Sequence, residues 1–242
     1  MAYNSYLIMD EKTALMDTVD IRGIEEWSRL LEETLDGRKL DYIVVQHMEP
    51  DHSGSLQYAI ETYPDAIVVG NAKTFNYIEQ FFGTDISDRK LEVKEGDTLL
   101  LGSHTLTFLM APMVHWPEVM VTYESSEKIL FAADGFGKFG TTDADEDWAC
   151  EARRYYFNIV GKYGPSVQAL LKKAGTVEIE KILPLHGPIL DSNLGYYIDL
   201  YDKWSSYTPE DKGVFIAYAS IHGNTKMAAE VLADKLRQLG EE

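Results

Sequence analysis

Along most of this chain, apolar residues recur in blocks that switch between the spacing of a helix and that of a strand. Ile24, Trp27, Leu31 and Leu35 follow the three-to-four-residue period of a helix with one buried face. Short continuous apolar runs, such as 41–45, predict buried strands instead. The pattern predicts a hairpin at 6–9 and 14–19, helices at 24–35, 56–63, 72–82, 146–160, 165–173 and 194–205, and strands at 41–45, 66–70, 181–185 and within 90–133. Blocks mixed in this way predict two sheets covered by helices.

The pattern changes near residue 207. Residues 207–213 form a polar stretch with Pro209 and Gly213, which predicts a linker. The apolar run 214–218 beyond it predicts a strand, and the apolar spacing after residue 226 predicts an amphipathic helix. The expected organisation is a large domain at 1–207, a linker at 208–213 and a strand–loop–helix unit at 214–242.

Composition limits the classes of function. The chain has 242 residues, of which 45% are hydrophobic and 12% aromatic, enough for a substantial core. Its 40 acidic and 22 basic residues give a net charge of −18, which argues against binding to nucleic acids or to anionic membranes. No long apolar span and no signal peptide are present, so a soluble, cytoplasmic protein is expected. The single Cys150 excludes an intrachain disulfide and is expected to be a buried small hydrophobe rather than a catalytic thiol.

The densest group of reactive side chains follows the apolar run 41–45. His47, Glu49, Asp51 and His52 are all potential metal ligands and lie within six residues. In an extended segment alternate residues point the same way, so His47, Glu49 and Asp51 are expected to converge, with His52 beside them. A polar loop with helix-capping carboxylates is the alternative interpretation. Two histidines interleaved with two carboxylates favour a metal site.

Three further ligand-type residues each follow a predicted strand and precede a turn signal. His115 comes after an apolar run that ends near residue 110, Asp134 directly follows the run 129–133, and His186 directly follows the run 181–185. A single histidine at a strand end is more often a structural hydrogen-bonding group. The repeated placement predicts one site built from several strand ends.

This order of residues, His-x-Glu-x-Asp-His followed by a distant His, Asp and His, resembles the metallo-β-lactamase fold. Glu49, where most of that superfamily has histidine, resembles the flavodiiron proteins, also called A-type flavoproteins or rubredoxin:oxygen oxidoreductases. A carboxylate in place of an imidazole makes the site harder, which favours iron over zinc. The resemblance implies an α/β fold, a metallo-β-lactamase-like αβ/βα sandwich, with two non-haem iron ions at one sheet edge. The implied ligands are His47, Glu49 and His115 for one iron, Asp51, His52 and His186 for the other, and Asp134 as the bridge. In some members of the family, the histidine equivalent to His52 does not reach the metal.

The C-terminal unit resembles the first βα unit of a flavodoxin-like domain. Its hydroxyl-rich loop at a helix N-terminus is suited to a phosphate group, and a capped helix is the alternative. The resemblance implies that Ser220, Asn224 and Thr225 bind the phosphate of FMN, although His222 stands where flavodoxins often have threonine. Family members carry more residues at both ends, so the chain is expected to be truncated, and to bind FMN weakly or not at all.

The resemblance implies an oxidoreductase that reduces O2 to water, NO to N2O, or both. Electrons would come through FMN from rubredoxin or a similar carrier, in a head-to-tail homodimer. Trp116, Tyr155 and Tyr156 are expected either to line the site and donate protons or to pack in the core. The alternatives are a dizinc hydrolase of the same fold, in which a metal-bound hydroxide attacks the substrate, and an inactive fragment without a working flavin domain.

Overall fold

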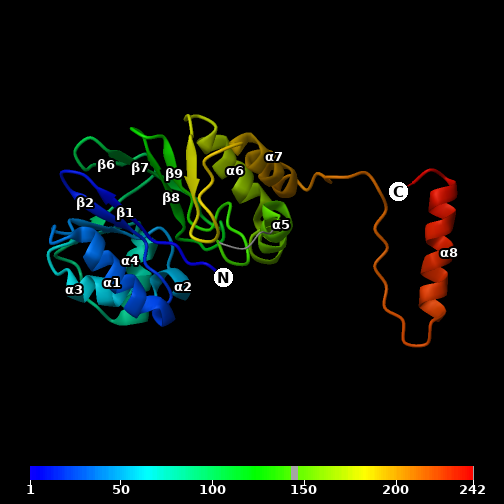
Figure 1. Ribbon diagram of the computed structural model, residues 1–242, viewed down its shortest axis with the longest axis horizontal. Coiled ribbons are helices and arrows are strands. Elements are labelled where there is room, and N and C mark those ends of the chain that lie inside the picture. Colours follow the sequence, from blue (N-terminus) through cyan, green and yellow to red (C-terminus); the bar gives the residue numbers. More distant parts are fainter. Residues whose placement is uncertain (143–146, 242) are drawn as a thin grey trace. The chain divides into compact units, whose positions relative to one another are not determined.

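The computed structural model describes residues 1–142 and 147–241, and the chain divides into two compact units, Met1–Tyr207 and the part that begins at Thr208. The larger unit contains two five-stranded sheets. As Figure 1 shows, α1, α3 and α4 flank one sheet, and α5, α6 and α7 flank the other. Within the described residues, none of the helices has both the length and the apolar character that a membrane crossing requires.

The first sheet has the strand order β1-β2-β3-β4-β5. β1 and β2 form the expected antiparallel hairpin, and the other neighbours are parallel. Parallel neighbours need crossover connections, which here contain the covering helices. The strands are β1 (Tyr6–Met9), β2 (Thr13–Met16), β3 (Tyr42–Val44), β4 (Ile67–Gly70) and β5 (Lys90–Glu92), and the helices are α1 (Ile24–Leu35), α3 (Leu56–Thr62) and α4 (Ala72–Phe82). A short 3-10 helix, Ile21–Gly23, precedes α1.

The second sheet has the strand order β10-β9-β8-β7-β6. β9 and β10 are parallel, and the other neighbours are antiparallel. The strands are β6 (Thr98–Leu100), β7 (Thr105–Met110), β8 (Met120–Glu124), β9 (Ile129–Phe131) and β10 (Lys181–Leu183), and the helices are α5 (Trp148–Ile159), α6 (Gly164–Ala174) and α7 (Leu194–Ser205). A second 3-10 helix, Gly161–Tyr163, joins α5 to α6.

Three apolar layers hold the larger unit together. Side chains alternate along each strand, so Leu15 and Ile43 pack toward the helices of their sheet, whereas Met16 and Val44 pack against the second sheet. A third cluster, which includes Trp204, fills the space between the second sheet and its helices. The expected sandwich of two helix-covered sheets is therefore confirmed.

The segment after β3 differs from the expected extended chain. Glu49 is still extended, but Pro50 opens a single helical turn, α2 (Pro50–Ser53). Proline favours the first helical position because its φ is already helical and its missing N–H is not needed there. Asp51 and His52 therefore project from a helical turn, and the expectation that alternate residues converge along an extended segment is wrong for Asp51.

Two further expectations are wrong. Residues 214–218 form no strand, and the smaller unit contains α8 (Asn224–Gln238) with none of its residues buried. The described part of that unit contains no other strand with which residues 214–218 could pair, so their backbone groups would have no partner in a sheet. Cys150 is exposed. It lies beside the stripe of α5 that buries Ala149, Ala152 and Tyr156, rather than in it.

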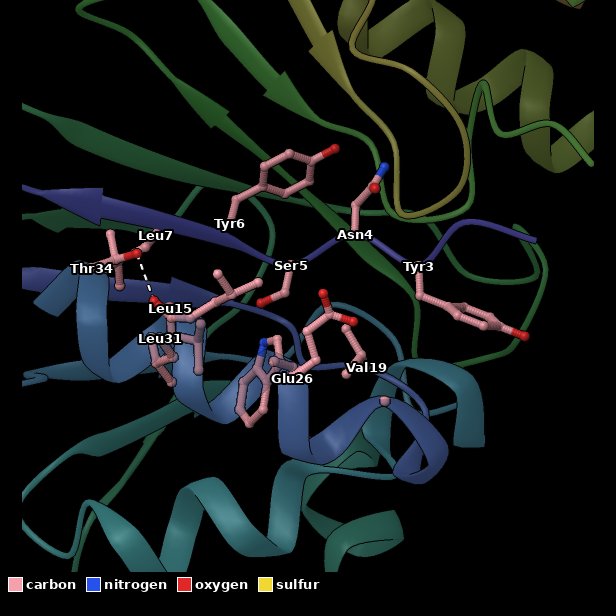
Figure 2. Close-up of a pocket in the computed structure, with 13 residues that line it drawn as sticks. Tyr3, Asn4, Ser5, Tyr6, Leu7, Leu15, Val19, Glu26, Leu31 and Thr34 are labelled. Carbon is pink, nitrogen blue, oxygen red and sulfur yellow. Dashed lines mark hydrogen bonds between the residues drawn. The ribbon is translucent and has the colours of Figure 1, made fainter. Parts of the chain in front are cut away.

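A groove of about 430 Å³ lies between β1 and α1 (Figure 2). Leu7 and Leu15 line it from the hairpin, and Trp27 and Leu31 line it from the helix. Its wall is mainly apolar, and none of the seven expected metal ligands belongs to it. The groove is therefore a feature separate from those ligands.

Gly54, directly after α2, is required by close backbone packing. A Cβ atom at this position would lie 2.6 Å from the Pro50 carbonyl oxygen and 2.7 Å from the Ile21 amide nitrogen. We expect Gly54→Ala to lower the free energy of unfolding by about 1–3 kcal/mol, because backbone atoms must move. Gly195→Ala is the control, since a Cβ atom there meets nothing within 4 Å. Equal midpoints of the two variants in urea would contradict the prediction.

Asp10 and His104 connect the β1–β2 turn to the β6–β7 turn. Asp10 Oδ2 lies 2.7 Å from His104 Nδ1 and accepts a hydrogen bond of 2.8 Å from the His104 amide. The hydrogen bond with Asp10 raises the pKa of His104 above 6.5. The contribution of the Asp10–His104 contact to the free energy of unfolding is therefore complete below the unfolded-state pKa of His104. This contribution is lost as pH rises through the raised folded-state pKa. We expect His104→Gln to lower the unfolding temperature more at pH 6 than at pH 9. The exposed His222→Gln serves as control, and an equal effect of His104→Gln at both pH values would disprove this role.

Candidate metal centre

The seven predicted ligands meet at one edge of the sandwich, in loops that follow four strands. The segment after β3 contributes His47 and Glu49 and leads into α2. The ends of β7, β9 and β10 lead into the remaining three loops. The side chains fall into two groups in which all ligand atoms lie within 4.8 Å of one another, namely His47, Glu49, His115 and Asp134 in the first group, and Asp51, His52 and His186 in the second group.

The first group gathers two imidazoles around two carboxylates. His115 Nε2 lies 2.9 Å from Glu49 Oε2 and 3.0 Å from Asp134 Oδ2. His47 Nε2 lies 3.3 Å and 3.5 Å from the same two oxygens. Because both Nε2 atoms and both oxygens point at one small volume, this group has the geometry of a cation site with nitrogen and oxygen donors.

The second group brings the Nε2 atoms of two tilted imidazoles together. His52 Nε2 lies 3.1 Å from His186 Nε2, and the Asp51 carboxylate lies 3.5 Å from the first and 3.4 Å from the second. His186 Nδ1 lies 2.9 Å from the Ala2 carbonyl oxygen. A carbonyl can only accept, so Nδ1 carries the proton and the lone pair of neutral His186 lies on Nε2, toward the other ligands.

Asp134 joins the two groups. Its Oδ2 faces the first group, whereas its Oδ1 lies 3.1 Å from His52 Nε2 and 3.6 Å from His186 Nε2. The side chain is completely buried. Ala133, directly before it, has a φ of 48°, a left-handed conformation that costs alanine of the order of 1 kcal/mol. The backbone thus accepts local strain where it delivers this carboxylate.

The carboxylates and the imidazoles of the centre stabilise one another's charged forms. Burial acts to lower the pKa of His115, but the carboxylates of Asp134 and Glu49 outweigh it and raise this pKa to about 9. Burial acts to raise the pKa of Glu49, but His115 and His47 lower it to about 2. Burial likewise opposes ionisation of Asp134, yet the imidazoles of His47 and His52 hold its pKa well below the usual range. A cation bound between these groups would displace protons from the imidazoles.

Several supporting residues were not predicted from the sequence. Glu118 Oε1 lies 2.9 Å from His47 Nδ1. Buried Asp17 accepts hydrogen bonds from the amides of Gln46 and His47, at 2.7 and 3.2 Å. In the sequence, the only sign that Glu118 belongs to the site is its position three residues after His115. Pairing across 71 residues cannot be derived from spacing.

The aromatic residues near the cluster divide into two sets. Trp116 contacts His47 edge-on, with ring centroids 5.4 Å apart, and the Tyr155 ring lies 5.5 Å from that of His186. Burial, together with the nearby Asp134 carboxylate, raises the pKa of Tyr155 well above its usual value. Tyr156 packs in the core against Trp204 instead. Tyr3, which was not predicted, lies 5.6 Å from His186 by ring centroids.

The three residues expected to hold a phosphate lie in the smaller unit. Ser220 lies in the loop before α8, and Asn224 and Thr225 are the first two residues of that helix. Gly223 precedes them with a φ of 84°, a value that favours glycine.

Comparisons with known proteins agree with this fold. A family model described as "ODP family beta lactamase" matches residues 1–187. A nitric oxide reductase of Moorella thermoacetica is 35% identical over 97% of this chain and 60% of its own length. The solved structure of a flavodiiron protein of Giardia intestinalis matches 99% of this chain and 60% of its own, with 32% identity and a TM-score of 0.89. The solved structure of a rubredoxin oxygen:oxidoreductase of Desulfovibrio gigas matches 99% of this chain and 62% of its own, with 33% identity and a TM-score of 0.87.

These matches extend over nearly all of this chain, although the chain spans only about 60% of the length of each of these proteins. The family model alone accounts for residues 1–187, which include all seven predicted ligands. The chain therefore belongs to the ODP family of β-lactamase-like proteins and carries the metallo-β-lactamase-like core of the flavodiiron proteins.

Proposed function

We propose that this core binds two non-haem iron ions and serves an oxidoreductase that reduces O2, NO or both. The position of Asp134 carries the proposal, because each of its two oxygens faces a separate group of ligands. That arrangement suits a pair of metal ions that share one carboxylate. The names of two similar proteins, a nitric oxide reductase and a rubredoxin oxygen:oxidoreductase, support the reaction class.

The donor atoms fit iron. Four imidazoles and three carboxylates contain no thiolate, and this mixture suits iron in its working oxidation states. Glu49 makes the first group more anionic than a group with three histidines. Asp51 Oδ1 and Asp134 Oδ1 are buried without a hydrogen-bond partner among the described residues. Cations held by the two groups would satisfy these oxygens.

The residues around the centre have separable tasks in such a reaction. Two bound ferrous ions would supply the reducing electrons and free coordination positions. His47, His52 and Asp134 are fully covered, whereas the side chains of Glu49 and Asp51 are 34% and 22% exposed, so a diatomic gas would enter on the carboxylate side. Tyr155 Oη keeps its proton because its pKa is raised, and it can donate a hydrogen bond toward the centre.

Electron supply is proposed from the smaller unit and from partners. In this proposal residues 1–207 are the diiron domain, 208–213 are a linker and 214–242 begin a flavodoxin-like domain. Ser220, Asn224 and Thr225 would hold the phosphate of FMN at the N-terminus of α8. Rubredoxin or a similar carrier would reduce the flavin, in a head-to-tail homodimer. A cytoplasmic location remains a prediction.

Metal analysis tests the proposal directly. We expect protein purified without oxygen, from cells supplied with iron, to contain two iron ions per chain. Turnover of O2 and NO with an artificial reductant, which bypasses the flavin, would then show which gas is preferred. Two zinc ions per chain despite available iron, together with esterase or lactonase activity, would support a dizinc hydrolase and overturn the proposal.

The bridging role of Asp134 gives a sharper expectation. Asp134→Ala is expected to lose both ions, because it removes a ligand from each group. His186→Ala is the matched comparison, since it removes a ligand from the second group alone and is expected to retain about one ion. Metal content after gel filtration measures both variants. Full occupancy in Asp134→Ala would show that this carboxylate does not bridge.

A further inference from the structure

Glu118 is a buried carboxylate for which the proposed reaction gives no task. It lies in the segment between β7 and β8, and its side chain is 0% exposed. Oε1 lies 2.9 Å from His47 Nδ1 and accepts a hydrogen bond of 2.9 Å from the Met48 amide. Oε2 has no hydrogen-bond partner within the part of the chain that the structure describes. Burial of a carboxylate with one unpaired oxygen costs free energy, so an interaction of Glu118 must offset that cost.

The contact with His47 fixes the form of this imidazole. A carboxylate next to Nδ1 favours a proton on that atom, so the lone pair lies on Nε2. Nε2 is the atom that faces Glu49 and Asp134. A negative charge behind a ligating imidazole also makes Nε2 a stronger donor to a metal ion.

In the second group, no carboxylate of the described residues is bonded to an Nδ1 atom, although the buried Asp17 acts on His52 electrostatically. His186 Nδ1 contacts the neutral carbonyl of Ala2. His52 Nδ1 is buried and has no hydrogen-bond partner among the described residues. A carboxylate therefore stands behind an imidazole of the first group, whereas a neutral carbonyl stands behind one of the second.

Glu118 is held firmly enough for this task. Asn71 Nδ2 donates a hydrogen bond of 2.5 Å to the Glu118 carbonyl oxygen, and Asn71 Oδ1 accepts from the amides of Lys73 and Thr74 at the start of α4. Glu118 also stands three residues after His115. A single loop thus contains one imidazole ligand of the first group and the carboxylate that orients the other.

We propose that Glu118 is a positioning residue that orients His47 and makes the metal ion of the first group electronically distinct from its neighbour. The inference rests on the proposed function to the extent that both groups hold a metal ion. The inference adds that the two metal ions differ electronically because Glu118, which is not itself a ligand, contacts a ligand of only one of them.

Two substitutions of Glu118 separate its charge from its hydrogen bond. Glu118→Ala removes both, and we expect the affinity of one of the two ions to fall by about 10- to 100-fold. Glu118→Gln keeps an oxygen that can accept from His47 Nδ1, so the expected loss is smaller. Glu124→Gln is the matched control, because Glu124 is equally buried but accepts hydrogen bonds from Ser126 and Glu127 instead of a ligand.

The measurement is anaerobic competition between the 242-residue chain and a chelator for Fe²⁺, followed by Mössbauer spectroscopy of protein loaded with ⁵⁷Fe. We expect two iron signals in the unsubstituted protein, and a shift of only one of them in Glu118→Gln. Unchanged affinities and spectra in both variants would overturn the inference. Equal loss of both ions, with a lowered unfolding temperature in Glu118→Gln, would show a merely structural role and overturn it as well.

Failure of the proposed function would look different. An unsubstituted protein that binds two zinc ions and no iron would contradict the diiron proposal alone. The loss of one ion in Glu118→Ala would then be measured with Zn²⁺ and the same chelator, and it would still support or overturn the role of Glu118.

Discussion

A fully buried carboxylate surrounded by imidazoles is the constraint on which the rest of this structure depends. Asp134 has no exposed surface, and an isolated charge in such a place costs several kcal/mol. His47, His52 and His115 offset that cost, and each in turn needs a defined orientation. The loops, the buried Glu118 and the strained residue before Asp134 can all be understood as means of holding this one arrangement of charge.

The sandwich makes the arrangement possible because parallel strands end at the same edge. β3 belongs to one sheet, and β9 and β10 belong to the other. Three apolar layers fix the sheets against each other, so loops that are far apart in sequence reach one place. Short segments anchored at the ends of rigid strands are better suited than long free loops to hold seven side chains close together.

The sequence predicted those features that are set by local pattern. The period of apolar residues predicted the helix at 72–82, because burial of one face decides its structure. The strand expected at 214–218 was wrong because a strand also needs a neighbour, which local pattern cannot provide. The turn at Pro50 was missed because an extended segment and a helical turn are both compatible with so short a motif. The ligand grouping followed from resemblance, whereas Glu118, Asp17 and the Ala2 carbonyl depend on how distant segments meet.

The grouping of ligands has a consequence for the fold itself. In the first group His47 and Glu49 follow β3 of one sheet, while His115 follows β7 of the other. In the second group Asp51 lies in α2, after β3, and His186 follows β10 of the other sheet. Any cation held by either group therefore ties the two sheets together. Because binding to the folded state alone stabilises it by mass action, occupancy of the centre and closure of the sandwich are coupled. The apolar layers position the site, and the occupied site in turn holds together the edge of the sandwich at which His47, His52 and Asp134 are buried.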